Sequence, residues 1–210
     1  MNTGNGTVWI TTISRRRFHV LEPQPDEIDI GDIAHSLALQ CRFGGHVPQP
    51  YSVAQHSILV SERAEATAPP GLERDAARWG LLHDAAEAYI VDVPRPVKRQ
   101  LRGYTEMEDE IAAAVVVRFD IAAGPGGIVY AIVKRADEEL LATEGRDLFG
   151  GGVHDTWNLN AGPIDGLRVV PWPWQEAKAR FLDRFAELFP ADMAHDVAVP
   201  SALPGLGREG

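Results

Sequence analysis

Apolar residues recur every three or four positions over most of the chain, a spacing typical of helices with one buried face. Residues 30–42 show this spacing at Ile33, Leu37 and Cys41. Asp32 is the candidate N-cap of that helix, and Ser52 is expected to open the next one. The same pattern predicts further helices over residues 52–67, 73–90, 105–119, 128–148 and 173–189.

Strand-like segments are expected only near the start of the chain. Thr7–Ile13 and Phe18–Leu21 are short β-prone runs that can pair as a hairpin around Ser14–Arg17. A series of helices with almost no alternating pattern indicates an all-α domain. The sequence therefore predicts an all-α helical bundle with a small N-terminal β-hairpin.

Proline and glycine mark the connections between the predicted helices. Pro69, Pro70 and Gly71 break the chain, and Asp92–Pro96 forms a stiff turn because its two prolines fix the backbone. A length of 210 residues fits one compact domain. We expect a single domain over residues 1–199, followed by a disordered Gly/Pro-rich tail over residues 200–210.

Composition and charge exclude several classes of partner. The chain has 30 acidic and 20 basic residues and a net charge of −10 at pH 7, which argues against a nucleic-acid or anionic-membrane surface. The single cysteine, Cys41, excludes an internal disulfide framework. No stretch approaches the roughly 18 apolar residues of a membrane span. We expect a cytoplasmic protein that binds neither nucleic acid nor membrane.

The pair His83-Asp84 lies among apolar residues in the segment predicted to be a helix over residues 73–90. Burying two ionisable groups there is costly unless they are paired or bound to a cation. Imidazole nitrogen together with carboxylate oxygen suits a borderline or hard divalent ion. His56 and Asp137, each within another apolar helix, are candidates for two further ligands.

Two histidines and two aspartates would fill four positions of an octahedron and leave two for water, as in catalytic metal sites. A metal in such a site lowers the pKa of a bound water and supplies hydroxide near neutral pH. Glu87 follows His83 by four residues and Asp84 by three, which places it on the same helical face. From there it could exchange a proton with the water or with the leaving oxygen.

The order His56, His83-Asp84, Asp137 resembles that of the HD-domain phosphohydrolase superfamily. The segment LLHDAAEAYIVDVPRPVK (residues 81–98) is similar to the "LHDAxE…xDxPxPxK" segment of its nucleotide-hydrolysing branch, and YSVAQH (51–56) is similar to "xSVAEH". The Arg42-Phe43 pair resembles the Arg-aromatic pair of bacterial deoxyribonucleoside 5′-monophosphatases. DIAHSLALQCRFGGH (32–46) also resembles phage-type dATP triphosphohydrolases.

The resemblance implies a role for each matching residue. One divalent ion (Mn, Co, Zn, Mg or Fe) would be held by His56, His83, Asp84 and Asp137, with additional Mg²⁺ for a triphosphate substrate. Glu87 would be the catalytic carboxylate, and Asp92 would contact the sugar hydroxyl at the catalytic centre. Substrate would also be bound by Arg42 and Lys98 at phosphate and by Phe43 beside the sugar or base. Arg95 is a further candidate for a phosphate contact. The resemblance also implies a homodimer.

These observations predict a metal-dependent phosphohydrolase acting on (deoxy)nucleotides. The substrate is either a monophosphate that loses phosphate or a triphosphate that loses tripolyphosphate, and the sequence leaves both open. A non-catalytic nucleotide sensor is an alternative. A di-iron oxygenase is another, for which only His35 and His46 are spare ligands. The other two His-Asp pairs, His154-Asp155 and His195-Asp196, are expected to be solvated.

Overall fold

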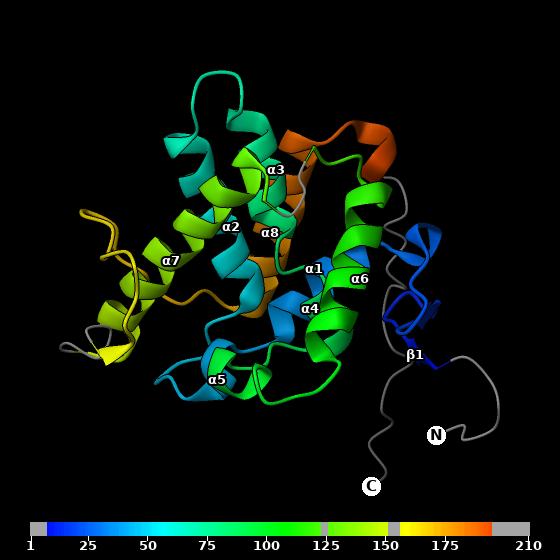
Figure 1. The fold of residues 1–210 in the computed structure, drawn as a ribbon, viewed down its shortest axis with the longest axis horizontal. Helices are drawn as coiled ribbons and strands as arrows, with labels where there is room; N and C mark the ends of the chain where they lie inside the picture. The colour runs from blue at the N-terminus through cyan, green and yellow to red at the C-terminus, as the bar shows by residue number, and fades with distance from the viewer. Residues whose placement is uncertain (1–7, 123–125, 151–155, 195–210) are drawn as a thin grey trace, which may run out of the picture.

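The computed structural model describes residues 8–122, 126–150 and 156–194 (Figure 1). Its helices are α1 (Ile30–Leu39), α2 (Val53–Thr67), α3 (Glu73–Leu82), α4 (Glu87–Ile90), α5 (Arg95–Lys98), α6 (Tyr104–Arg118), α7 (Ile128–Leu148) and α8 (Trp174–Leu188). Short 3₁₀ turns cover Pro25–Glu27, Arg42–Gly45 and Ala191–Ala194. Strands β1 (Trp9–Thr11) and β2 (Arg17–His19) pair antiparallel, with Trp9 opposite His19. The predicted all-α fold with an N-terminal hairpin is confirmed. The predicted tail, 200–210, lies outside the described residues.

The first helix begins at a different cap from the one that the sequence suggested. The Asp29 side chain accepts hydrogen bonds from the backbone N–H groups of Gly31 (2.8 Å) and Asp32 (3.1 Å), so Asp29 and not Asp32 is the N-cap of α1. Asp32 lies within the first turn and instead accepts hydrogen bonds from the backbone N–H (2.8 Å) and the hydroxyl (2.7 Å) of Ser14. Asp32 therefore ties the hairpin to α1. The expected Ser52 cap of α2 is present and accepts from the Gln55 N–H.

The helix predicted over residues 73–90 is wrong as a continuous element. It divides into α3 and α4 at a turn closed by hydrogen bonds from Ala85 N to Leu82 O and from Glu87 N to Asp84 O, both 3.0 Å long. These are i→i−3 bonds, which wind the backbone more tightly than an α-helix. Hydrophobic periodicity did not separate the two, because the residues on both sides of the turn are buried. His83 and Asp84 lie in this tightened turn.

The stiff turn expected at Asp92–Pro96 also contains a short helix, α5. Its N-cap is Pro94, and a second proline lies within its first two positions. Proline is compatible with the first turn of a helix because its missing N–H would have no partner there. The prolines therefore start a helical turn here, where the sequence alone suggested only a rigid connection.

Helix α2 is the centre of the bundle and packs against α3, α7 and α8, while α1 packs against α8, α4 and α2 (Figure 1). One hydrophobic core joins these helices, and Leu81, Phe181 and Phe185 are among its fully buried side chains. The hairpin joins the core through Phe18, whose ring stacks on Tyr89 of α4 with centroids 3.8 Å apart. This packing places α2, the α3–α4 turn and α7 around one point. Among the described residues, no helix has the length and apolar character needed to cross a membrane.

The contact between α2 and α3 depends on a glycine. A Cβ atom at Gly80 would lie 2.8 Å from the Ser61 Cα, closer than real Cβ atoms approach, and 3.1 Å from the Ser61 nitrogen, which is also unusually close. Ser61 also donates a hydrogen bond to the Ala77 carbonyl (2.8 Å) across the same contact. The two backbones therefore touch, and this contact sets the distance between the helix that carries His56 and the turn that carries His83.

We predict that Gly80→Ala lowers the free energy of unfolding by about 1–3 kcal/mol, because the new methyl group meets backbone that cannot yield easily. Alanine gains about 1 kcal/mol of helix propensity over glycine, so the clash itself is larger than the net loss by about that amount. Gly162 is exposed, and a methyl group there would have no atom within 4 Å, so Gly162→Ala is the matched control. Urea unfolding of both variants tests this. An unchanged unfolding midpoint for Gly80→Ala would mean that α2 and α3 can move apart to accommodate the methyl group at no cost in stability.

Candidate metal centre

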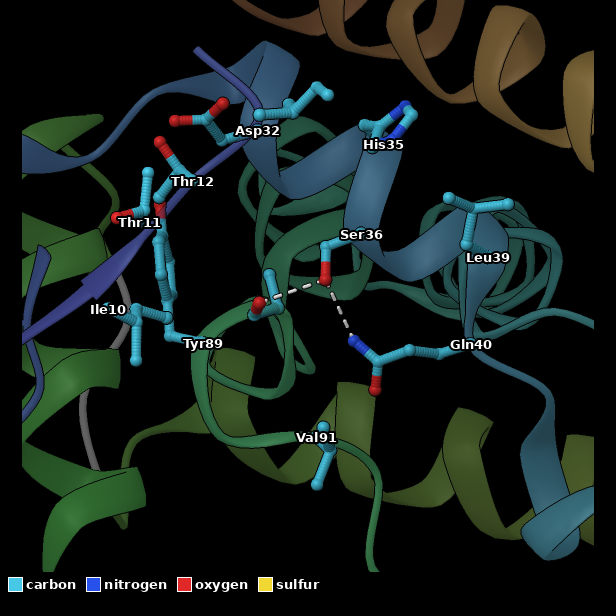
Figure 2. A pocket seen from close by; sticks show the side chains of 12 residues that line it. Ile10, Thr11, Thr12, Asp32, His35, Ser36, Leu39, Gln40, Tyr89 and Val91 are labelled. Atoms are coloured by element: carbon cyan, nitrogen blue, oxygen red, sulfur yellow. Dashed lines mark hydrogen bonds between the residues drawn. The ribbon is translucent and has the colours of Figure 1, made fainter. Parts of the chain in front are cut away.

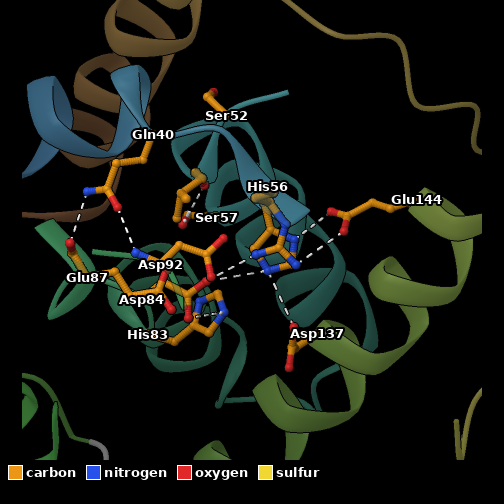
Figure 3. Close-up of polar contacts among 12 residues, drawn as sticks. Gln40, Ser52, His56, Ser57, His83, Asp84, Glu87, Asp92, Asp137 and Glu144 are labelled. Atoms are coloured by element: carbon orange, nitrogen blue, oxygen red, sulfur yellow. Dashed lines mark hydrogen bonds and ion pairs between the residues drawn. The ribbon is translucent and has the colours of Figure 1, made fainter. Parts of the chain in front are cut away.

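The four predicted metal ligands lie together at the point where α2, the α3–α4 turn and α7 meet (Figure 3). The Nε2 atom of His56 lies 3.7 Å from an Asp84 oxygen and 3.4 Å from an Asp137 oxygen. The His83 Nε2 lies 3.2 Å from the other Asp84 oxygen. One ligand atom from each of His56, His83 and Asp84 falls within a group whose members are all within 4.8 Å of one another. The chain thus gathers nitrogen and oxygen donors from segments up to 81 residues apart in one place.

Both histidines present an uncommitted nitrogen to this centre. The His83 Nδ1 donates to the Gly80 carbonyl (2.8 Å), since a carbonyl oxygen only accepts, and this leaves a lone pair on Nε2. The His56 Nδ1 is bound to Glu144 (2.6 Å). The two Nε2 atoms are buried and make no hydrogen bond. Buried polar atoms without a partner call for an explanation, and this donor set fits a divalent cation.

Negative charge dominates the immediate surroundings of His56. Burial and the neighbouring Arg42 act to lower the pKa of His56, but Glu144 and Asp137 outweigh them and raise it to about 9. Burial opposes the ionised form of Asp137, but its contacts with His56 hold the pKa of that carboxyl well below its usual range. A cation at this centre would therefore meet an ionised carboxylate and a histidine in a strongly negative environment.

Basic side chains surround the cluster. Arg42 is buried, with one nitrogen 3.6 Å from Asp84 and another 3.2 Å from Glu144. Arg95 and Lys134 approach the same oxygen of Asp137, at 3.3 and 3.2 Å, and each is nearly half exposed. Lys134 was not predicted from the sequence, although it precedes Asp137 by three residues and so shares its face of α7. Positive charge thus extends from the buried Arg42 outward to solvent.

Glu87 begins α4 and is 4% exposed. Its Oε1 lies 3.5 Å from the ammonium group of Lys98, and its Oε2 has no hydrogen-bond partner. Burial and the charges of Asp84 and Asp92 raise the pKa of this carboxyl well above its usual range. Burial is also the main cause that raises the pKa of Asp92. The structure therefore brings the predicted catalytic carboxyl groups close to the cluster, in surroundings that favour a bound proton.

The loop that carries Asp92 is held in a strained conformation. Val91 has φ +67° and ψ 154°, a combination that β-branched residues rarely adopt. The Tyr104 hydroxyl donates to the Val91 carbonyl (2.5 Å), and the Asp92 N–H donates to the Gln40 side-chain oxygen (2.8 Å). The Gln40 amide also donates to the Glu87 carbonyl (2.9 Å). Gln40 therefore holds the backbone at both Glu87 and Asp92. The sequence did not single out this residue.

A separate cavity of about 290 Å³ lies on the other side of Gln40, between the hairpin, α1 and α4 (Figure 2). Ser36 lines it and accepts a hydrogen bond from the Gln40 amide (3.0 Å). His35 also lines this cavity, and its ring meets Trp174 edge-on. Among the described residues, neither His35 nor the exposed His46 belongs to the group formed by His56, His83 and Asp84. The pairs at 154–155 and 195–196 lie outside the described residues.

Phe43 lies beside Arg42 and not within the His/Asp cluster. The guanidinium carbon of Arg42 is 5.4 Å from the centre of the Phe43 ring. Phe149 and Trp157 complete an aromatic group, with centroids 5.1 and 5.7 Å from that of Phe43. Phe43 has a positive φ of 59°, a conformation that bulky residues seldom adopt. The sequence did not predict the two further aromatic residues, because they follow the segment that carries the family resemblance.

The fold and the site together define a helical protein with a partly buried cluster of two histidines and two aspartates. The chain matches no family model. It is 36% identical over 184 residues to the uncharacterized protein YfdR of Escherichia coli (strain K12), which covers 86% of this chain and 95% of the relative. It is 35% identical over 186 residues to an uncharacterized protein of Rhodobacter capsulatus, covering 84% and 93% respectively. The chain belongs to the family of these two proteins.

We predict that Co²⁺ or Mn²⁺, at about 100 times its dissociation constant, raises the free energy of unfolding by about 2.7 kcal/mol, because only the folded chain assembles the donors. His83→Ala should remove this stabilisation, and His46→Ala, at an exposed position, should retain it. Isothermal titration measures the dissociation constant of the metal, and urea unfolding measures the free energy of unfolding. A wild-type chain that gains no stability from Mn, Co, Zn, Mg or Fe would exclude a metal centre here.

Proposed function

We propose that this protein is a divalent-metal-dependent phosphohydrolase of (deoxy)nucleotides with a site of the HD-domain type. One observation carries the proposal. Glu87, a buried carboxyl group with an unpartnered oxygen, lies beside a cluster of His and Asp donors whose Nε2 atoms are also unpartnered. Structural ion pairs satisfy their own atoms, whereas a site that acts on a ligand leaves such atoms available. The homodimer and the cytoplasmic location implied by the sequence stay predictions.

His56, His83, Asp84 and Asp137 would hold the ion. Such an ion, when bound, polarises a phosphoryl oxygen and lowers the pKa of a coordinated water. Arg42 presents two nitrogens toward carboxylates at the edge of the cluster, and its planar guanidinium suits phosphate oxygens equally well. Arg42 would therefore neutralise the charge that accumulates on the phosphoryl group during hydrolysis.

Hydrolysis of a phosphate ester joins a water oxygen to phosphorus and releases the ester oxygen, which then needs a proton. Glu87 can supply that proton because burial and the nearby Asp84 and Asp92 favour its protonated form. Lys98 lies 3.5 Å from Glu87 and also donates to Glu108 (2.6 Å), so it fixes the carboxyl on one side. Gln40 holds the backbone of Asp92, whose carboxyl group would accept a hydrogen bond from a sugar hydroxyl.

The arrangement of cations favours a substrate with more than one phosphate. Arg95 and Lys134 flank the outer oxygen of Asp137 and are 43% and 46% exposed. They add two exposed cations to the buried Arg42, and a chain of phosphates can use more cations than a single phosphate can. A dNTP releasing tripolyphosphate, with additional Mg²⁺ on its phosphates, is therefore the preferred version, and a dNMP releasing phosphate is the second.

We predict that Glu87→Gln lowers kcat for nucleotide hydrolysis by about 10²- to 10⁴-fold, the usual contribution of a positioned acid or base. Its affinity for Co²⁺ should stay close to that of the wild type, since Glu87 is not among the four expected ligands. Glu110→Gln makes the same chemical change at an exposed position of α6 and serves as the control. Wild-type protein that binds metal and nucleotide but turns over no nucleotide would instead indicate a sensor.

We predict that Lys134→Met raises KM for a dNTP more than it raises KM for a dNMP, because Lys134 lies at the outer edge of the positive surface. Product analysis by ion chromatography separates phosphate from tripolyphosphate and identifies the reaction. Arg135 is exposed and precedes Asp137 by two residues, and Arg135→Met provides a control on the same helix. Equal KM changes for the two substrates, with phosphate as the only product, would favour the monophosphate version.

A further inference from the structure

Glu144 is completely buried, and it lies on α7 seven residues after Asp137. No sequence motif marked it. One of its oxygens, Oε1, lies 2.6 Å from the His56 Nδ1 and accepts a hydrogen bond from the Tyr51 hydroxyl at 2.7 Å. The other, Oε2, lies 3.2 Å from a guanidinium nitrogen of Arg42. A single carboxylate therefore contacts an expected metal ligand, an expected phosphate-binding group and a core tyrosine.

Removing a carboxylate from water is costly unless charged and hydrogen-bonded partners compensate for the lost hydration. Glu144 has such partners, since its two oxygens contact the His56 imidazole, the Tyr51 hydroxyl and the Arg42 guanidinium. A carboxylate paired with a guanidinium accepts hydrogen bonds, so in the 2.6 Å contact the His56 Nδ1 donates its proton to Glu144. A metal ion that displaced the remaining ring proton would bind the lone pair of Nε2, the atom that faces Asp84 and Asp137.

The same carboxylate limits where Arg42 can point. While one of its nitrogens is held at Glu144 Oε2, another lies 3.6 Å from Asp84 at the edge of the cluster. Arg42 follows α1 in the chain and has a bulky neighbour, Phe43, in a left-handed conformation. Glu144 therefore holds the Arg42 guanidinium on one side, and its other side faces Asp84. Figure 3 shows Glu144 beside His56.

We propose that Glu144 is a positioning residue that orients His56 toward the metal and Arg42 toward the substrate phosphate at the same time. This inference rests on the proposed function, because that function supplies the roles of His56 and Arg42. The inference goes beyond that function because it makes the affinities for metal and for phosphate depend on one buried side chain, which touches neither the metal nor the phosphate. Carboxylate partners of metal-bound histidines commonly change metal affinity by about 10- to 100-fold.

The test is Glu144→Gln, which keeps the shape of the side chain and removes its charge. We expect Co²⁺ affinity, measured by isothermal titration, to fall by about 10- to 100-fold. The visible absorption of the bound Co²⁺ should change as well, because the His56 ring loses its charged hydrogen-bond partner. The affinity of the Co²⁺-loaded protein for inorganic phosphate should also fall. Tyr51→Phe, which removes only the hydrogen bond from the Tyr51 hydroxyl to Oε1, should leave all three readouts close to those of the wild type.

Glu144→Asp retains the charge and withdraws the carboxylate by one methylene group, so it provides a second variant if Glu144→Gln does not fold. Either variant, folded and with wild-type affinities for Co²⁺ and phosphate, would overturn the proposal, as would a loss of metal affinity without any loss of phosphate affinity. If neither variant folds, ¹⁵N-histidine NMR of the Zn²⁺-loaded wild type decides: a His56 ring bound to metal through Nδ1, or lacking a proton there, contradicts the assigned orientation.

The two proposals fail in different ways. Wild-type protein that binds Co²⁺ and phosphate but hydrolyses no nucleotide would refute the proposed reaction and leave the role of Glu144 intact. Wild-type protein that hydrolyses nucleotides, with Glu144 variants that bind both probes normally, would refute the role of Glu144 alone.

Discussion

His56 has no exposure to solvent, yet it lies in contact with three carboxylates, and the rest of the site depends on how their charges are balanced. Asp84, Asp137 and Glu144 would repel one another strongly if they were buried without cations. Arg42 balances part of this charge from inside the protein, and Arg95 and Lys134 balance part of it from the rim. A divalent cation among the donors would complete the balance and would use the two Nε2 atoms, which have no hydrogen-bond partner among the described residues.

The scaffold holds these charges in place by bringing backbones close together. Gly80 allows α3 to touch α2 at Ser61, and the Gly80 carbonyl accepts the hydrogen bond that orients His83. Gly80 therefore sets both the distance between the two helices and the orientation of the His83 ring. The turn after α3 then departs from α-helical geometry, so His83 and Asp84 point toward α2 and α7 and do not continue along the helix surface.

Sequence patterns were sufficient for most helices and for the residues brought to the cluster, but not for the residues that support it. Periodic apolar positions give α7 at its observed bounds, because that helix has one buried face along its whole length. They could not separate α3 from α4, because buried apolar residues continue across the break. The break itself is a change in backbone hydrogen bonding. Gln40 contacts Glu87 and Asp92, which lie 47 and 52 residues away, and Glu144 contacts His56 at a separation of 88 residues. Such pairs carry no local signal, because each member is an ordinary polar residue within its own segment.

Backbone strain gives independent support for regarding this region as functional. Phe43 and Val91 are bulky residues with positive φ, and each adjoins a residue of the proposed site, Arg42 and Asp92 respectively. Such conformations cost about 1–3 kcal/mol each and persist only where surrounding contacts hold them. The loop at Val91 is held by hydrogen bonds with the side chains of Tyr104 and Gln40. The loop at Phe43 is held by packing against two aromatic rings. Stability alone would favour glycine at both positions. Their retention is explained if the loops must present Arg42 and Asp92 in one fixed orientation, as a site organised before its ligand binds requires.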